Sequence, residues 1–131
     1  MEQHYKVIGI LLIVLAFIHS IFPKYFDWKK DLSSVSLVNR QIIYIHTLFI
    51  GVALLLMGIL CFTSAQELTE TPFGKKIALG FGIFWLIRLL VQFFGYSTEL
   101  WRGKRFETTM HIVFAFFWAY LTVVFLGTYF A

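Results

Sequence analysis

Five polar side chains that could do chemistry stand inside apolar stretches of this 131-residue chain. They are His19, His46, Arg88, Gln92 and His111. Ionisable side chains are costly to place in an apolar surrounding, and where they persist they usually bind a ligand, carry protons or pair with each other. These residues are therefore the candidate site.

The three histidines predict a cofactor or metal site. Neutral imidazole is the commonest protein ligand for metals, and His19, His46 and His111 could hold Zn²⁺, Cu or Fe with one position left open. Glu107 precedes His111 by four residues, so it could supply a further ligand or orient that histidine. Two of the histidines could instead bind haem b from opposite sides, with Arg88 facing the propionates. Redox or related chemistry would follow from either arrangement.

Arg88 and Gln92 favour a second interpretation. Their spacing of four residues places them on one face of a helix, and Tyr96 continues that face. A guanidinium on such a face could hold the head group of a lipid, a quinone or a carboxylate-bearing substrate. Histidines in series could also relay protons. With a ligand held by Arg88, the chain would be either an enzyme or a transporter for a lipid-soluble or small anionic molecule.

A third interpretation needs no ligand at all. Polar side chains join membrane helices by hydrogen bonds, and arginine can extend toward the head groups. With only 131 residues, the chain has almost nothing outside its apolar stretches to bind a soluble substrate. A non-catalytic small subunit or an assembly partner of a larger membrane complex is therefore a further hypothesis.

Four apolar runs must position these residues, and they cover 5–22, 41–63, 77–96 and 109–131. Each is near the roughly 20 residues that a helix needs to cross the hydrocarbon core. The composition agrees, because 60% of the residues are hydrophobic and 14% are charged, whereas soluble domains are about a quarter charged. The sequence predicts an all-α, integral membrane four-helix antiparallel bundle with short loops, as one domain over residues 1–131.

Helix direction determines where the polar residues meet. His19 lies near the end of the first run, and His46 and His111 lie near the starts of the second and fourth. Arg88 and Gln92 approach the end of the third. If sequential helices alternate in direction, all five fall in one layer about 10 Å thick at 1.5 Å per residue. Gly9, Ala16, Gly51 and Gly58 recur at spacings that predict close helix packing.

Charge predicts the orientation. Seven lysines and arginines lie in the first and third loops, against three on the other side. By the positive-inside rule, loops one and three face the cytoplasm and both termini lie outside, as expected for a bacterial inner (cytoplasmic) membrane protein. The expected partners are the lipid bilayer and either a second membrane protein or further copies of this chain.

Several protein classes are excluded. The chain contains no GxGxxG, P-loop, HExxH or GxSxG pattern, and no basic surface large enough to predict nucleic acid binding. Its single cysteine, Cys61, cannot form an internal disulfide and is expected to be a small core residue.

Overall fold

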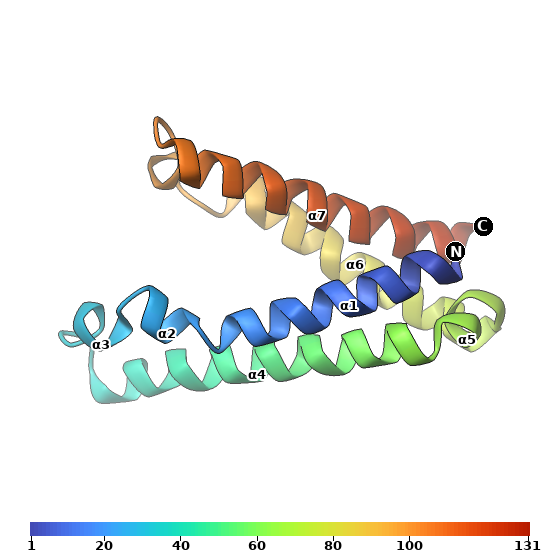
Figure 1. Cartoon of the computed structure of the whole chain (residues 1–131), viewed down its shortest axis with the longest axis horizontal. Helices are drawn as coiled ribbons and strands as arrows, with labels where there is room; N and C mark the ends of the chain where they lie inside the picture. Colours follow the sequence, from blue (N-terminus) through green and yellow to red (C-terminus); the bar gives the residue numbers. More distant parts are fainter. The chain divides into compact units, whose positions relative to one another are not determined.

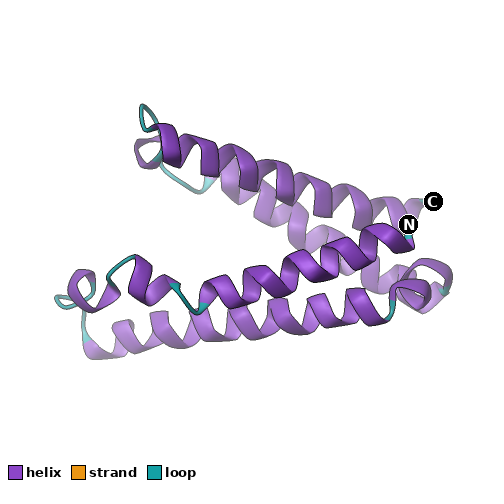
Figure 2. Cartoon of the chain, in the orientation of Figure 1, coloured by secondary structure: helices purple, strands orange, loops and turns teal.

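The chain is entirely helical between its turns. A computed structural model describes all 131 residues and contains no strand, as Figure 2 shows. Four helices are long and apolar enough to cross a membrane, namely α1 (Glu2–His19), α4 (Leu37–Thr63), α6 (Pro72–Phe94) and α7 (Arg105–Phe130). The predicted helical class and the four candidate spans are confirmed (Figure 1).

The helices form two compact units, one of Glu2–Ala65 and one of Met1 with Gln66–Ala131. In the first unit, α1 packs against α4 through glycines. A Cβ added to Gly9 would lie 2.7 Å from the Gly58 carbonyl oxygen, and one added to Gly58 would lie 2.8 Å from that of Gly9. Further along, Gly51 faces the Ala16 carbonyl. Since residue numbers rise along α1 as they fall along α4, the pair is antiparallel, and the predicted packing through small residues is confirmed.

In the second unit, α6 packs against α7 through aromatic side chains. Phe81 meets Phe125 with ring centroids 5.4 Å apart, and Trp85 stacks on Trp118 at 5.0 Å. From the first contact to the second, residue numbers rise along α6 and fall along α7, so the two helices are antiparallel. Trp85, Trp118 and Phe125 are buried, and this aromatic seam is the core of the unit.

The helices begin and end at different residues from the apolar runs. The first apolar run extends to Phe22, whereas α1 ends at His19. In a continuous helix the ring of Pro23 would clash with the carbonyl four residues earlier, which belongs to His19. At the next helix, α4 begins at Leu37 because the Ser36 hydroxyl accepts the Asn39 N–H and caps it ahead of the apolar run.

The bounds of α6 and α7 also differ from those of the third and fourth apolar runs. The Thr71 hydroxyl accepts the Gly74 N–H at 2.9 Å, so α6 begins at Pro72, five residues before the predicted start at residue 77. It ends at Phe94 rather than at Tyr96. The last helix, α7, begins at Arg105 rather than at residue 109.

The connections, which the sequence predicts as loops, contain short helices. The first connection folds into α2 (Phe22–Tyr25) and α3 (Trp28–Asp31), and the second contains α5 (Ala65–Glu70). A 3-10 turn, Thr98–Leu100, lies in the third. Gly74 lies within α6, where an added Cβ would collide with the Glu67 carbonyl. Glycine is needed there because α5 folds directly onto α6.

Candidate functional site

Gln92 is the centre of a polar network between α6 and α7. Its side chain is buried, with 6% of its surface exposed. Its Oε1 accepts from Arg88 Nη1 at 3.2 Å and from Trp118 Nε1 at 3.3 Å. Its Nε2 lies 3.0 Å from His111 Nδ1 and donates to the His111 carbonyl at 3.3 Å. Both acceptor positions and both donor hydrogens of the amide are therefore used.

The chemistry of its neighbours fixes which way the amide points. Arginine and the tryptophan indole can only donate, so Arg88 and Trp118 must face the oxygen of Gln92. The amide nitrogen then faces His111, and Nδ1 of that ring must be the acceptor. The hydrogen of a neutral His111 ring therefore lies on Nε2. The orientation follows from donors and acceptors together.

Arg88 is half-buried, and its partners within this unit are neutral. Beyond the bond to Gln92, Nη2 donates to the Tyr96 hydroxyl at 3.3 Å. The guanidinium carbon lies 5.0 Å from the Trp118 ring centroid and 5.4 Å from that of Tyr96, both within cation–π range. Two of the five guanidinium hydrogens are used in these bonds. The remaining donors and the positive charge have no carboxylate partner in the structure.

Stacked rings hold the network in place. Trp118 lies parallel to Trp85 with an interplanar angle of 9°, and Phe114 stacks on it at 5.5 Å. His111 stacks on Trp101 at 4.8 Å and 16°. Stacked aromatic pairs contribute about 0.5–1.5 kcal/mol each beyond their buried area. The residues around Gln92 are therefore held by packing as well as by hydrogen bonds.

His19 and His46 lie in the other unit. The Nδ1 of His19 bonds to the Leu15 carbonyl at 2.8 Å, and its ring packs on Phe22 at 4.6 Å. His46 is exposed on α4 and makes no hydrogen bond. The Cβ of His19 lies 3.6 Å from a Cβ built at Gly51, which is five residues, or about 7.5 Å, along α4 from His46. The two histidines are therefore not level with each other on this helix pair.

The structure brings together part of the predicted site. Arg88, Gln92, Tyr96 and His111 are linked within the α6 and α7 unit, although Tyr96 lies in the turn after α6 rather than on its face. Glu107 is exposed on α7 and is not bonded to His111. The layer drawn from all four helices, with His19 and His46, stays a prediction.

The donor set of this network fits a metal or haem iron poorly. No group of three or more histidine, cysteine, aspartate and glutamate side chains is gathered as metal ligands. His111 uses its Nδ1 lone pair to accept from Gln92, and its Nε2 carries hydrogen, so neither nitrogen offers a free lone pair. His19 differs, because the bond from Nδ1–H to a backbone carbonyl leaves Nε2 able to accept.

An open apolar hollow of about 340 Å³ lies beside this network on α6 and α7. Phe93, Phe116 and His111 form part of its wall, whereas Arg88 does not. It therefore adds no charged group to the site.

Trp118 is the site residue that the sequence analysis missed. It donates to Gln92, lies under Arg88 and stacks between two rings. One signal was available: Trp118 follows His111 by seven residues, which is two helical turns, so both lie on one face of α7. The abundance of aromatic residues in this run hid that signal.

The comparisons with known proteins add no family or relative. No protein-family model, no curated protein and no solved structure matched the chain.

Proposed function

We propose that the chain is an integral membrane protein in which Arg88 and Tyr96 bind the acidic group of a small or lipid-soluble ligand. The acidic group is a carboxylate or a phosphate. One observation carries this proposal: the half-buried guanidinium of Arg88 is held by an amide, a phenol and two ring faces, all of them neutral.

Electrostatics favours an anion at this place. A charge within a membrane span is costly unless it is compensated, and neutral hydrogen bonds and ring faces compensate it only in part. The guanidinium keeps three hydrogens beyond those used by Gln92 and Tyr96. Tyr96 accepts from Arg88, so its own hydroxyl hydrogen is free to donate. An acceptor-only anion would receive hydrogen bonds from both residues, and charge-assisted bonds of this kind are the strong ones.

The neighbours of Arg88 act as positioning residues. Gln92 holds one guanidinium nitrogen and Trp118 supports its face, so the donors are oriented before a ligand arrives. Preorganisation of this kind lowers the entropic cost of binding.

A second candidate function rests on the completeness of the Gln92 network. All four hydrogen-bonding positions of the amide are satisfied without a ligand, so the network could serve only to hold the register of α6 and α7. A small non-catalytic subunit or assembly partner would need nothing more. The haem or transition-metal hypothesis has less support, because His111 offers no free lone pair.

A binding experiment separates these candidates. The purified full chain in nanodiscs would be titrated calorimetrically with decanoate, decyl phosphate, acetate and inorganic phosphate, with decyltrimethylammonium as the cationic control. Arg88→Lys keeps the charge but removes the planar fork. We expect one of the four anions to bind and its affinity to fall about tenfold to a hundredfold in Arg88→Lys, as for a lost charge-assisted hydrogen bond.

The comparison among the titrated anions also identifies the kind of molecule that carries the acidic group. Tighter binding of the decyl compounds indicates a lipid-soluble ligand, and equal binding of acetate or phosphate indicates a small free anion. Arg105→Gln, at the exposed start of α7, is the matched control and should bind as the wild type does. No binding of any anion, or equal affinity in Arg88→Lys, would contradict the proposal and leave the assembly role favoured.

A further inference from the structure

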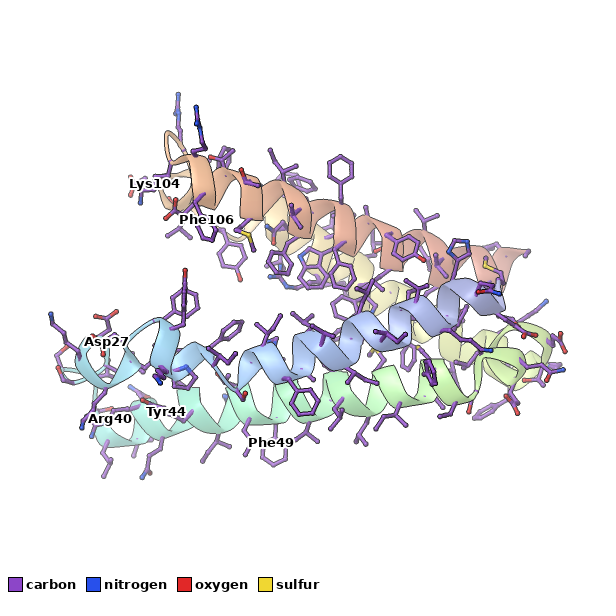
Figure 3. All side chains as sticks on the ribbon, in the orientation of Figure 1. Asp27, Arg40, Tyr44, Phe49, Lys104 and Phe106 are labelled. Atoms are coloured by element: carbon purple, nitrogen blue, oxygen red, sulfur yellow. The ribbon has the colours of Figure 1, made fainter.

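The connection between α1 and α4 folds into a compact cap of two single helical turns. Asp27 stands between α2 and α3 with φ of 51° and ψ of 52°. This left-handed conformation is uncommon for a residue other than glycine, and aspartate is one of the residues that tolerate it. It turns the chain sharply, so that α3 follows α2 without a long loop. Figure 3 shows Asp27 at the same end of the α1 and α4 pair as Arg40 and Tyr44.

Aromatic contacts attach this cap to both long helices. Phe22 packs on His19 at the end of α1 with ring centroids 4.6 Å apart. Trp28 in α3 meets Tyr44 in α4 edge-on at 5.4 Å. The cap is therefore fixed at two points, and the side chains that it does not use in these contacts face outward.

The outward side chains form what we call the basic-aromatic cap, which consists of Lys24, Tyr25, Phe26, Lys29 and Lys30. All five are exposed, and Tyr25 and Phe26 have 65% and 51% of their surface exposed. None of the three lysines is paired with a carboxylate, although Asp27 and Asp31 lie nearby in sequence. The two rings meet edge-on at 5.0 Å, which makes a small apolar wedge among three cations.

We propose that the basic-aromatic cap binds the head groups of anionic phospholipids. This inference rests on the membrane insertion proposed above but not on a ligand at Arg88. Unpaired lysines near a bilayer attract anionic head groups, and exposed aromatic rings settle at the level between head groups and acyl chains. Both kinds of side chain stand directly at the ends of two apolar helices, which places them at that level.

A soluble acidic partner would fit the lysines but not the two rings. A water-facing site with no membrane contact would leave the surfaces of Tyr25 and Phe26 in solvent. At the membrane interface the same rings are buried among lipid. The observations therefore favour a lipid surface over an acidic peptide or nucleic acid.

The test is lipid selectivity of the full chain in mixed bilayers. Spin-labelled phosphatidylglycerol and phosphatidylcholine would be added separately, and the share of each that is immobilised by the protein would be measured by electron spin resonance. We expect several-fold preference for phosphatidylglycerol in the wild type. Lys24→Gln, Lys29→Gln and Lys30→Gln combined should remove most of it, and added salt should weaken it.

Lys75→Gln with Lys76→Gln is the control. It removes two lysines from the start of α6 and should keep the preference. Equal association of the two lipids with the wild type, or unchanged preference in the triple variant, would overturn the proposal. Loss of preference in the Lys75 and Lys76 variant to the same extent as in the triple variant would overturn it as well, because the preference would then follow total charge rather than the cap.

The aromatic part of the cap is tested by a separate variant. Tyr25→Ala with Phe26→Ala should lower the immobilised share of both lipids while the ratio between them stays near the wild-type value. If neither share changed, the rings would not be in lipid, and a soluble acidic partner would replace the bilayer as the occupant. Carbonate extraction of the same membranes checks insertion, so failure of the membrane proposal is distinguished from failure of the cap.

Discussion

At the scale of single residues, the side-chain amide of Gln92 determines the behaviour of its neighbours. Arg88 and Trp118 can only donate, so they take the amide oxygen, and the amide nitrogen is left for His111. A glutamine in this position therefore makes Nδ1 of His111 a hydrogen-bond acceptor, which leaves the ring hydrogen on Nε2. It also leaves Arg88 without an internal counter-charge, which is the condition for binding an external anion.

Gln92→Glu should reverse this arrangement. A carboxylate accepts on both oxygens, so His111 would place its hydrogen on Nδ1, and Arg88 would gain a partner of opposite charge. We expect nitrogen-15 spectra of labelled histidine to show Nε2–H for wild-type His111 and Nδ1–H for the variant. Binding of the acidic ligand should fall at least tenfold, although Arg88 is unchanged.

Gln41→Glu, at an exposed position of α4, is the matched control for that substitution. It should change neither the spectrum of His111 nor ligand binding. If wild-type His111 already carried its hydrogen on Nδ1, the assigned network would be wrong.

Part of this network was predictable from the sequence. The spacing of Arg88 and Gln92 predicts a shared helix face, and the structure links them. Tyr96 follows α6, which ends at Phe94, and the long side chain of Arg88 still reaches its hydroxyl. Trp118 was missed because a run rich in aromatic residues does not indicate which ring faces the neighbouring helix.

At the scale of elements, glycines determine how closely α1 and α4 approach. A Cβ at Gly58 would lie 2.8 Å from the Gly9 carbonyl oxygen and 2.9 Å from a side-chain carbon of Ile13. Real Cβ atoms do not approach other atoms so closely, so the helices would have to separate. If the helices lie in a membrane as proposed, where no hydrophobic effect drives them together, this close contact would carry much of their association.

Gly58→Ala should therefore destabilise the chain by about 1–3 kcal/mol, as overpacking does in other tightly packed cores. Gly80→Ala is the matched control, because an added Cβ there meets nothing within 4 Å. Alanine has the better helix propensity, so the control should be stabilised by roughly 0.5–1 kcal/mol. Reversible unfolding in mixed micelles measures both, and a Gly58→Ala chain as stable as Gly80→Ala would contradict the packing described.

Apolar length predicted the four long helices but not the short ones. The turns α2, α3 and α5 have four to six residues, which is too short for a helical period to be visible in the sequence. The end of α1 at His19 depends on Pro23 rather than on hydropathy. The apolar run itself continues beyond His19 to Phe22. Caps and prolines therefore set the helix boundaries that apolar composition left uncertain.

At the scale of the whole molecule, the chain consists of two antiparallel helix pairs that are joined by different kinds of residue. The pair of α1 and α4 joins through glycines and carries the basic-aromatic cap, while the pair of α6 and α7 joins through aromatic rings and the Gln92 network. The predicted layer of all three histidines depends on how four helices pack together, which local spacing does not determine. The cytoplasmic placement of loops one and three likewise stays a prediction from charge.

Native mass spectrometry of the chain released from its own membranes would show whether Arg88 holds an acidic ligand. We expect the wild-type protein to retain a bound acidic molecule, a carboxylate or a phosphate, and Arg88→Gln to be released from the same membranes without it. A bound haem or metal ion in the wild type, or the same acidic molecule retained by Arg88→Gln, would rule out the anion site proposed at Arg88.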